Sequence, residues 1–173
     1  PTYRNGEVVE DKYKGEYSDQ VYTNELIKMI DGKKDDGKPF FAYLPFTAIH
    51  LPLQAPESAY QDKVDYYVEH GWDSIREDRF ERMKEMGVIP KDADISSRNA
   101  LSRPWDSLSE KEQEWYGKKM AVAMGMMEMQ DQQVGQVVDY LKEIGEYDNT
   151  YIMYLADNGP EAADITGENI SDL

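Results

Sequence analysis

Cysteine is absent from the 173 residues, which excludes disulfides, thiolate metal sites and a cysteine nucleophile within this sequence. The redox compartment therefore cannot be read from cysteine usage. Long hydrophobic runs are also missing, since no apolar stretch approaches the roughly 20 residues of a membrane span. Basic residues are few, with 19 Lys and Arg against 35 Asp and Glu, giving a net charge of −16. This balance argues against a general nucleic-acid surface and predicts high solubility.

The composition that remains is typical of a folded globular protein. Hydrophobic residues make up 40% of the chain and charged residues 31%. The length suits one domain by size. Because the sequence begins with Pro1 rather than Met, we expect it to be a piece of something longer.

One short apolar run ends abruptly at polar residues. Residues 150–156 (TYIMYLA) favour a strand buried on both faces, as in a parallel sheet, and Asp157-Asn158-Gly159-Pro160 is a turn signal. Ligands of open α/β sheets lie at the carboxyl ends of the strands. Asp157 and Asn158 offer hard oxygen donors that suit Ca²⁺ or Mg²⁺. On these residues alone, an ordinary turn in which Asp and Asn bond their own backbone is favoured.

A second strand, expected over residues 39–44, leads into a proline-rich loop that carries a histidine. Pro45, Pro52 and Pro56 hold this loop extended and preclude a continuous regular element. His50 lies just beyond the strand. A histidine between apolar neighbours is more often packed than catalytic, but its position after a strand end raises the odds of function.

Helices are expected over residues 18–31, 57–68, 73–86 and 110–144. Ser18 or Asp19 can cap the first helix, which ends at Gly32 in a left-handed conformation. The second and third helices are separated at Gly71. The fourth is expected to begin with a capping box, for which the pairs Ser107/Glu110 and Ser109/Glu112 both match and Ser109 is preferred.

The last of these helices carries a stripe of apolar residues at spacings of three and four, which is typical of a core-facing surface. Asp131 falls on the stripe and needs a partner there, most simply as a structural hydrogen-bond acceptor or in an ion pair. Gly135 within the helix suggests close approach of another element. The stripe consists of Met120, Met124, Met127, Val134, Val138 and Leu141.

Together these elements predict an enlarged βαβ crossover, with two parallel strands separated by a helical excursion. A right-handed crossover places the carboxyl ends of both strands at one edge of the sheet. His50 and the pair Asp157-Asn158 would then face the same cleft. Imidazole and a hard cation both bind charged oxygens, so the sequence predicts a metal-assisted site for an anion.

Several stretches resemble one known family. Residues 39–56 (PFFAYLPFTAIHLPLQAP) look like the histidine loop of prokaryotic-type arylsulfatases, and residues 148–159 (DNTYIMYLADNG) look like their second metal-binding strand end. Residues 71–79 (GWDSIREDR), 105–110 (WDSLSE) and 127–135 (MEMQDQQVG) are also similar to that subgroup. The order and spacing of these motifs is more specific than any one of them.

The resemblance implies a partial alkaline-phosphatase-like α/β fold, with parallel central strands and a helical insertion, and hydrolysis of small-molecule sulfate esters. It implies a formylglycine nucleophile, made from Cys or Ser, and a Ca²⁺-type cation, with Mg²⁺ as the alternative. Carried over, Asp157 and Asn158 would be metal ligands, and His50 would bind the sulfate on its leaving-group side. Relatives of this kind are often periplasmic or secreted.

The family's nucleophile motif, Cys or Ser followed by x-Pro-x-Arg, is not found in the sequence, nor are the tandem aspartates that open its metal site or its Lys-x-His pair. We therefore expect residues 1–173 to be the central part of a single sulfatase catalytic domain, incomplete at both ends and inactive alone. Two other interpretations stay open: a phosphate ester or phosphonate hydrolase of the same superfamily, and a non-catalytic acidic α/β binding module.

Overall fold

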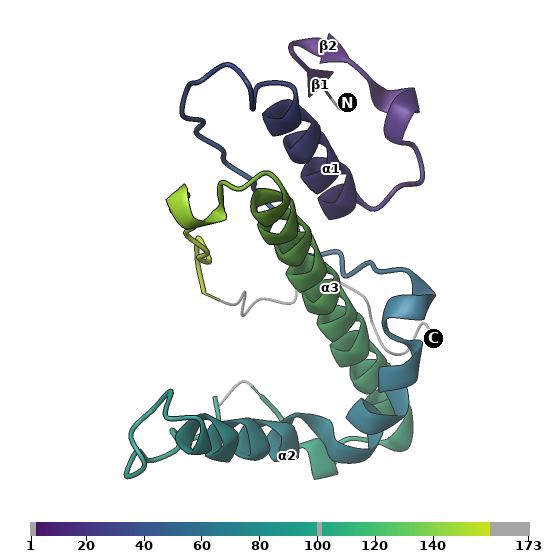
Figure 1. The fold of residues 1–173 in the computed structure, drawn as a ribbon. Helices are drawn as coiled ribbons and strands as arrows, with labels where there is room; N and C mark the ends of the chain where they lie inside the picture. The colour runs from purple at the N-terminus through teal and green to yellow at the C-terminus, as the bar shows by residue number, and fades with distance from the viewer. Residues whose placement is uncertain (1–2, 100–101, 160–173) are drawn as a thin grey trace. The chain divides into compact units, whose positions relative to one another are not determined.

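The computed structural model describes residues 3–99 and 102–159 of the chain. They divide into two compact units, one of residues 3–52 with 126–159 and one of residues 53–125. The unit boundary falls within the longest helix, α3 (Glu110–Glu143). Figure 1 shows the elements of both units along the chain. Within the described residues, no helix is long and apolar enough to cross a membrane.

The first unit begins with a small hairpin and a helix. Strands β1 (Tyr3–Arg4) and β2 (Glu7–Val8) pair antiparallel around Asn5 and Gly6, which both have positive φ angles, as a two-residue hairpin turn requires. The 3-10 helix η1 (Glu10–Tyr13) leads into α1 (Ser18–Asp31). The expected helix 18–31 is confirmed. Its end at Gly32 is also confirmed, but the left-handed conformation expected there is wrong, because Gly32 has a right-handed φ of −67°.

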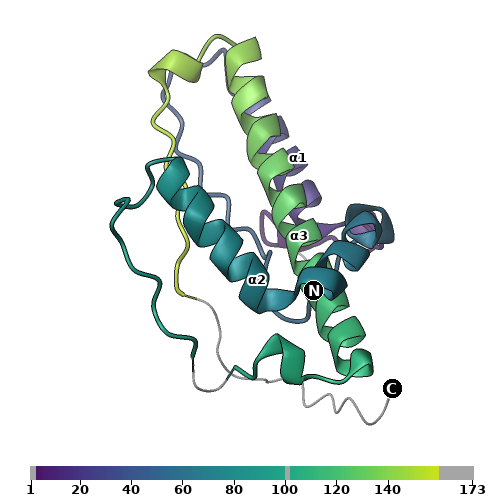
Figure 2. The same cartoon turned by 90° about the horizontal axis from the view of Figure 1, so that it is seen from below.

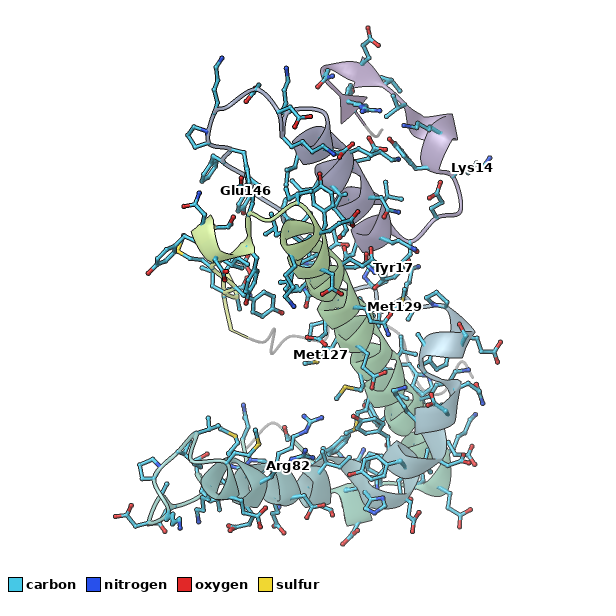
Figure 3. All side chains as sticks on the ribbon, viewed as in Figure 1. Lys14, Tyr17, Arg82, Met127, Met129 and Glu146 are labelled. Carbon is cyan, nitrogen blue, oxygen red and sulfur yellow. The ribbon has the colours of Figure 1, made fainter. Side chains whose placement is uncertain are left out.

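Helix α1 lies beside the C-terminal part of α3, as Figure 1 shows. The Tyr140 hydroxyl of α3 donates a hydrogen bond of 3.1 Å to Asp31 at the end of α1. Leu141 and Met126 of α3 are buried, whereas Met127, labelled in Figure 3, is 47% exposed. The buried side of α3 therefore differs from the predicted stripe at this point.

The two predicted strands do not belong to a sheet in the described part of the chain. Residues 39–46 and 150–156 have no regular secondary structure, and Figures 1 and 2 draw both segments without arrows. The only sheet among the described residues is the β1–β2 pair. A strand needs a neighbour for its backbone N–H and C=O groups, and these segments have none there. Their parallel pairing stays a prediction.

The side chains of these two segments are also open to solvent. Phe41 and Tyr151 are more than 90% exposed, and Tyr43, Met153 and Leu155 are also largely exposed. Burial on both faces, which the sequence pattern predicts for a parallel sheet, is thus not observed within the described residues.

The second unit is helical. Two short 3-10 helices, η2 (Glu57–Ala59) and η3 (Gln61–Lys63), precede α2 (Val64–Glu85), and η4 (Trp105–Ser107) precedes α3. One more 3-10 helix, η5 (Tyr147–Asn149), follows α3 and belongs to the first unit. The core of the second unit contains Tyr67, Ile75 and Ala121, with Tyr60, Val64, Met120 and Met124 packed against it.

Glycine fixes the geometry of this unit at two places. The predicted break at Gly71 is confirmed, since this residue interrupts α2 with φ 63° and ψ 177°. A Cβ atom there would lie 2.2 Å from the ring of Trp105. A Cβ at Gly117 would lie 2.6 Å from Val68. The close approach expected at Gly135 is wrong, because no atom of another element lies within 4 Å of a Cβ built there.

The capping box at the start of α3 is confirmed at Ser109. The Glu112 carboxylate accepts hydrogen bonds from the Ser109 backbone N–H at 2.8 Å and from its hydroxyl at 2.9 Å. Arg103 also donates to Glu112 at 2.6 Å. The backbone N–H of Ser109, with the Arg103 guanidinium and the Ser109 hydroxyl, lowers the pKa of Glu112 to about 2.

Candidate functional site

His50 lies at the end of a tight turn in the proline-rich loop. Its backbone N–H donates a hydrogen bond of 2.9 Å to the carbonyl oxygen of Thr47, which closes the turn over residues 47–50. The side chain of His50 is exposed. The loop thus presents the imidazole to solvent instead of packing it in the core, which argues against a packed structural histidine.

The ring of His50 is oriented by its own neighbour. Its Nδ1 atom lies 2.6 Å from the carbonyl oxygen of Leu51. A carbonyl oxygen only accepts, so Nδ1 carries the hydrogen in this contact. Nε2 is then left as an acceptor in the neutral ring and as a second donor in the imidazolium ion.

Asp19 holds the turn that carries His50. Its side chain is fully buried, and it accepts hydrogen bonds from the Thr47 N–H and hydroxyl at 2.9 Å each and from the Ala48 N–H at 3.2 Å. The expected capping role of this residue is not observed, since α1 has no side-chain cap hydrogen bond. The carboxylate reaches across to a loop about 28 residues away in sequence.

Asp157 and Asn158 form an exposed bend directly after residues 150–156. The Asn158 amide nitrogen donates a hydrogen bond of 2.7 Å to the carbonyl oxygen of Gly159. This contact leaves the amide oxygen of Asn158 and the carboxylate of Asp157 as acceptors on adjacent residues. Pro160, the last residue of the predicted turn, lies outside the described residues.

The oxygen pair fits part of the coordination shell of a hard cation. Ca²⁺ takes six to eight oxygen ligands and Mg²⁺ six, of which Asp157 and Asn158 can supply two or three. Within residues 3–99 and 102–159, no group of three His, Cys, Asp or Glu side chains could hold a metal ion. The donor chemistry therefore suits such an ion, and further ligands would be required.

Gln130 of α3 connects the two parts of the candidate site. Its amide nitrogen donates to the carbonyl oxygen of Ala48, in the turn before His50, at 3.4 Å. Its amide oxygen accepts from the hydroxyl of Tyr154, three residues before Asp157, at 3.1 Å. One side chain thus contacts both the histidine loop and the segment that leads to the oxygen pair. The meeting of His50 and Asp157 in one cleft stays a prediction.

Two residues of this region differ from expectation. Asp131, predicted to lie on a buried stripe, is exposed. Its carboxylate can be solvated, so the desolvation argument for a partner does not apply. Gln130 gave no signal in the sequence, because polar residues are common on a helix that is only partly buried.

Comparison with known proteins places these features in a family. The model of the sulfatase family matches residues 1–170. The chain belongs to the sulfatase family. The resemblance seen in the histidine loop and at the strand end of residues 148–159 is thereby confirmed at the level of the family. Family membership implies an alkaline-phosphatase-like α/β fold, of which the described residues show the helical part and the two extended segments.

Relatives come from a fungus, a bacterium and a green alga. An uncharacterized sulfatase of Schizosaccharomyces pombe is 35% identical over 163 residues, covering 94% of this sulfatase chain and 29% of the relative. An arylsulfatase of Klebsiella aerogenes is 32% identical over 147 residues, covering 85% of the chain and 31% of the relative. An arylsulfatase of Volvox carteri is 26% identical, covering 85% of the chain and 23% of the relative. The chain spans less than a third of the length of these curated relatives.

Proposed function

We propose that residues 1–173 are the central part of a sulfatase catalytic domain that hydrolyses sulfate esters, with aryl sulfates among its substrates. The observation that carries the proposal is the family match over residues 1–170. In this proposal, residues 39–44 and 150–156 are neighbouring parallel strands of a sheet that the complete protein finishes. Their exposed aromatic and aliphatic side chains support this, because apolar strands of this kind are buried in α/β sheets.

Asp157 and Asn158 would hold the metal ion, with Ca²⁺ as the expected ion and Mg²⁺ as the alternative. The ion supplies positive charge that stabilises the sulfate oxygens during reaction. Asp157 ends a segment that is tied to α3 through Tyr154 and Gln130, at 3.1 Å. That tie restrains the segment just before the two ligands, which helps to fix where they emerge.

His50 would contact the sulfate ester on its leaving-group side. Nδ1 carries a hydrogen bonded to the Leu51 carbonyl oxygen, so Nε2 is the ring nitrogen that remains to contact a ligand. To donate a hydrogen bond to the departing oxygen, Nε2 must also be protonated, so the imidazolium is the active form in this role. A donor placed there stabilises the negative charge that develops as the ester bond breaks.

The nucleophile would be a formylglycine made from a Cys or Ser outside these 173 residues. The chain contains no Cys, and none of its Ser residues lies in an x-Pro-x-Arg context. We therefore expect the isolated 173-residue chain not to hydrolyse a chromogenic aryl sulfate. Turnover by the purified chain that disappears in His50→Ala would contradict this part of the proposal.

In the complete protein, His50→Ala should lower kcat for an aryl sulfate by about 100-fold or more, the usual effect of removing a positioned proton donor. His70→Ala is a matched control, because His70 is the other histidine of the chain and its Nδ1 also contacts a carbonyl oxygen, that of Tyr66, at 2.9 Å. The activity of His70→Ala should stay within twofold of wild type. Equal losses in both variants would remove the assigned role of His50.

Metal binding is tested separately with Asp157→Ala in the complete protein. Calcium content, measured by atomic emission after dialysis, and activity should fall together. Asp148→Ala removes an exposed carboxylate just before the same segment and should keep both. Wild-type metal content in Asp157→Ala would count against the ligand assignment.

Rates on paired sulfate and phosphate esters with the same leaving group distinguish a sulfatase from a phosphate ester or phosphonate hydrolase. A higher kcat/KM for the sulfate supports the proposal. A higher value for the phosphate would assign the chain to another activity of the superfamily, and no turnover of either ester would favour the binding-module interpretation.

A further inference from the structure

The buried carboxylate of Asp19 is the starting point. A charge with no solvent contact is costly unless it is fully bonded, and the backbone N–H groups of two consecutive residues satisfy it here. Oδ1 accepts from the Thr47 N–H at 2.9 Å and Oδ2 from the Ala48 N–H at 3.2 Å. Hydrogen bonds to an ionised acceptor are about twice as strong as neutral ones. Both peptide groups are therefore fixed by one side chain of α1.

The hydroxyl groups of Thr47 and Ser18 add further hydrogen bonds around Asp19. The Thr47 hydroxyl donates to Asp19 Oδ1 at 2.9 Å. The Ser18 and Thr47 hydroxyl oxygens lie 2.9 Å apart. Since the Thr47 hydroxyl hydrogen points to Asp19, the Ser18 hydroxyl is the donor in that pair. Residue 47 is thus held through its backbone and its side chain at once.

The restraint continues from Thr47 to the ring of His50 through hydrogen bonds. The Thr47 carbonyl oxygen accepts from the His50 backbone N–H at 2.9 Å, and the His50 ring is bonded to the Leu51 carbonyl oxygen at 2.6 Å. On the other side of the turn, Gln130 donates to the Ala48 carbonyl oxygen at 3.4 Å. The Ala48 residue is therefore held at its N–H by α1 and at its C=O by α3.

We propose that Asp19 is a positioning residue for His50, which clamps the Thr47–Ala48 backbone so that the imidazole is presented in one orientation. Asp19 touches no substrate in this role. It acts through the turn, and Gln130 of α3 holds the carbonyl oxygen of Ala48, in the next peptide group. The inference rests on the proposed function, because the role of His50 is assigned there.

The decisive variant is Asp19→Asn in the complete protein. An amide has one acceptor oxygen, so its NH₂ group faces a backbone N–H and at least one of the two clamp bonds is lost. We expect kcat for an aryl sulfate to fall at least tenfold with KM within threefold of wild type. Asp31→Asn is the matched control, because it makes the same change at the other end of α1, where the carboxylate contacts Lys34 and Tyr140. Its kcat should stay within twofold.

A double-mutant cycle separates positioning from general stability. If Asp19 acts through His50, Asp19→Asn should change the residual rate of His50→Ala less than threefold. The same tenfold loss in both backgrounds would overturn the proposal. Should Asp19→Asn fail to fold, Thr47→Val carries the test, since residue 47 is exposed and the change removes only the hydroxyl contacts with Asp19 and Ser18. It should lower kcat at least threefold in wild type and not in His50→Ala.

Hydrogen exchange of residues 46–51 provides a readout that does not depend on activity. The Thr47 and Ala48 amides should exchange at least tenfold faster in Asp19→Asn and at the wild-type rate in Asp31→Asn. Unchanged exchange in Asp19→Asn would refute the clamp even in an active sulfatase. Faster exchange in a protein without sulfatase activity would keep the clamp and reject the proposed function.

Discussion

The Glu25 carboxylate provides the sharpest stability test. It lies on the buried side of α1 and is surrounded by cations, with Lys28 Nζ at 2.9 Å, Arg4 Nη1 at 3.2 Å and Lys12 Nζ at 3.4 Å. Arg4 and Lys12 belong to the hairpin and to η1, so this one carboxylate ties both segments to α1. The helix in turn carries Asp19, the residue that holds the histidine loop.

The magnitude follows from the pKa of Glu25. The hydrogen bond from Lys28, with the contact from Tyr13 and the charges of Arg4 and Lys12, outweighs desolvation and lowers this pKa from 4.5 to about 2. At about 1.4 kcal/mol per pKa unit, this depression corresponds to about 3 kcal/mol of stability. A lowered folded-state pKa stabilises above the unfolded value and is lost as the pH falls. The contribution is therefore complete above about pH 5, and about half remains at pH 3.

We expect Glu25→Gln to lower the free energy of unfolding by about 3 kcal/mol at pH 7 and by about half as much at pH 3. Urea unfolding of both proteins at the two pH values, followed by circular dichroism, measures the difference. Glu81→Gln is the matched control, because Glu81 pairs with Lys84 at 3.3 Å with the same i,i+3 spacing but is 66% exposed at its side chain. An exposed pair of this kind contributes about 0.5 kcal/mol or less.

Two results would refute this reasoning. The first is a loss in Glu25→Gln at pH 7 no larger than that in Glu81→Gln, which would mean that the three cations do not stabilise the carboxylate. The second is a difference between wild type and Glu25→Gln that stays constant from pH 7 to pH 3, because a protonation-linked contribution must shrink over that range.

Further predictions concern α2, α3 and the start of α3, and thermal unfolding of the complete protein measures all of them. Gly71→Ala should destabilise by at least about 2 kcal/mol, because its backbone conformation is nearly restricted to glycine and the added Cβ would overlap the ring of Trp105. Gly135→Ala, with open space around its Cβ, should be neutral or stabilising by up to about 1 kcal/mol, and equal losses at both glycines would contradict the packing argument. Ser109→Ala should cost about 1 kcal/mol through the lost cap, and more than Ser107→Ala; the reverse order would reject the cap at Ser109.

Local signals in the sequence predicted α1, α3 and the break within α2. The helix expected over residues 57–68 is only partly confirmed, because residues 57–59 and 61–63 form 3-10 helices and α2 begins at Val64. The break at Gly71 and the cap at Ser109 were both readable, because each depends on residues close in sequence. The face that α1 buries was less readable. Asp19 and Glu25 are buried there, whereas Met29 is half exposed, because Thr47 donates to Asp19 and the cations of Arg4 and Lys12 contact Glu25 from other segments. Contacts of that kind are not visible as periodicity.

The sequence nominates residues for the candidate site, whose roles stay predictions, but it does not nominate the residues that support them. His50, Asp157 and Asn158 could be selected because each follows a predicted strand and fits a family motif. The hydrogen bonds between Asp19 and the turn before His50 could not be predicted, since an aspartate in the first turn of a helix is most simply explained as a cap. Gln130 carries no distinctive pattern at all, although it bonds both halves of the site.

The exposed, unpaired segments 39–44 and 150–156 have a consequence for handling the protein. Each presents β-prone aromatic and aliphatic side chains together with unpaired backbone groups, the combination that templates association between chains. A polypeptide restricted to these 173 residues would therefore aggregate through these segments on concentration. Pairing of both segments in the complete domain, as proposed above, should restore solubility, so the high net negative charge alone is not expected to keep the 173-residue chain dispersed.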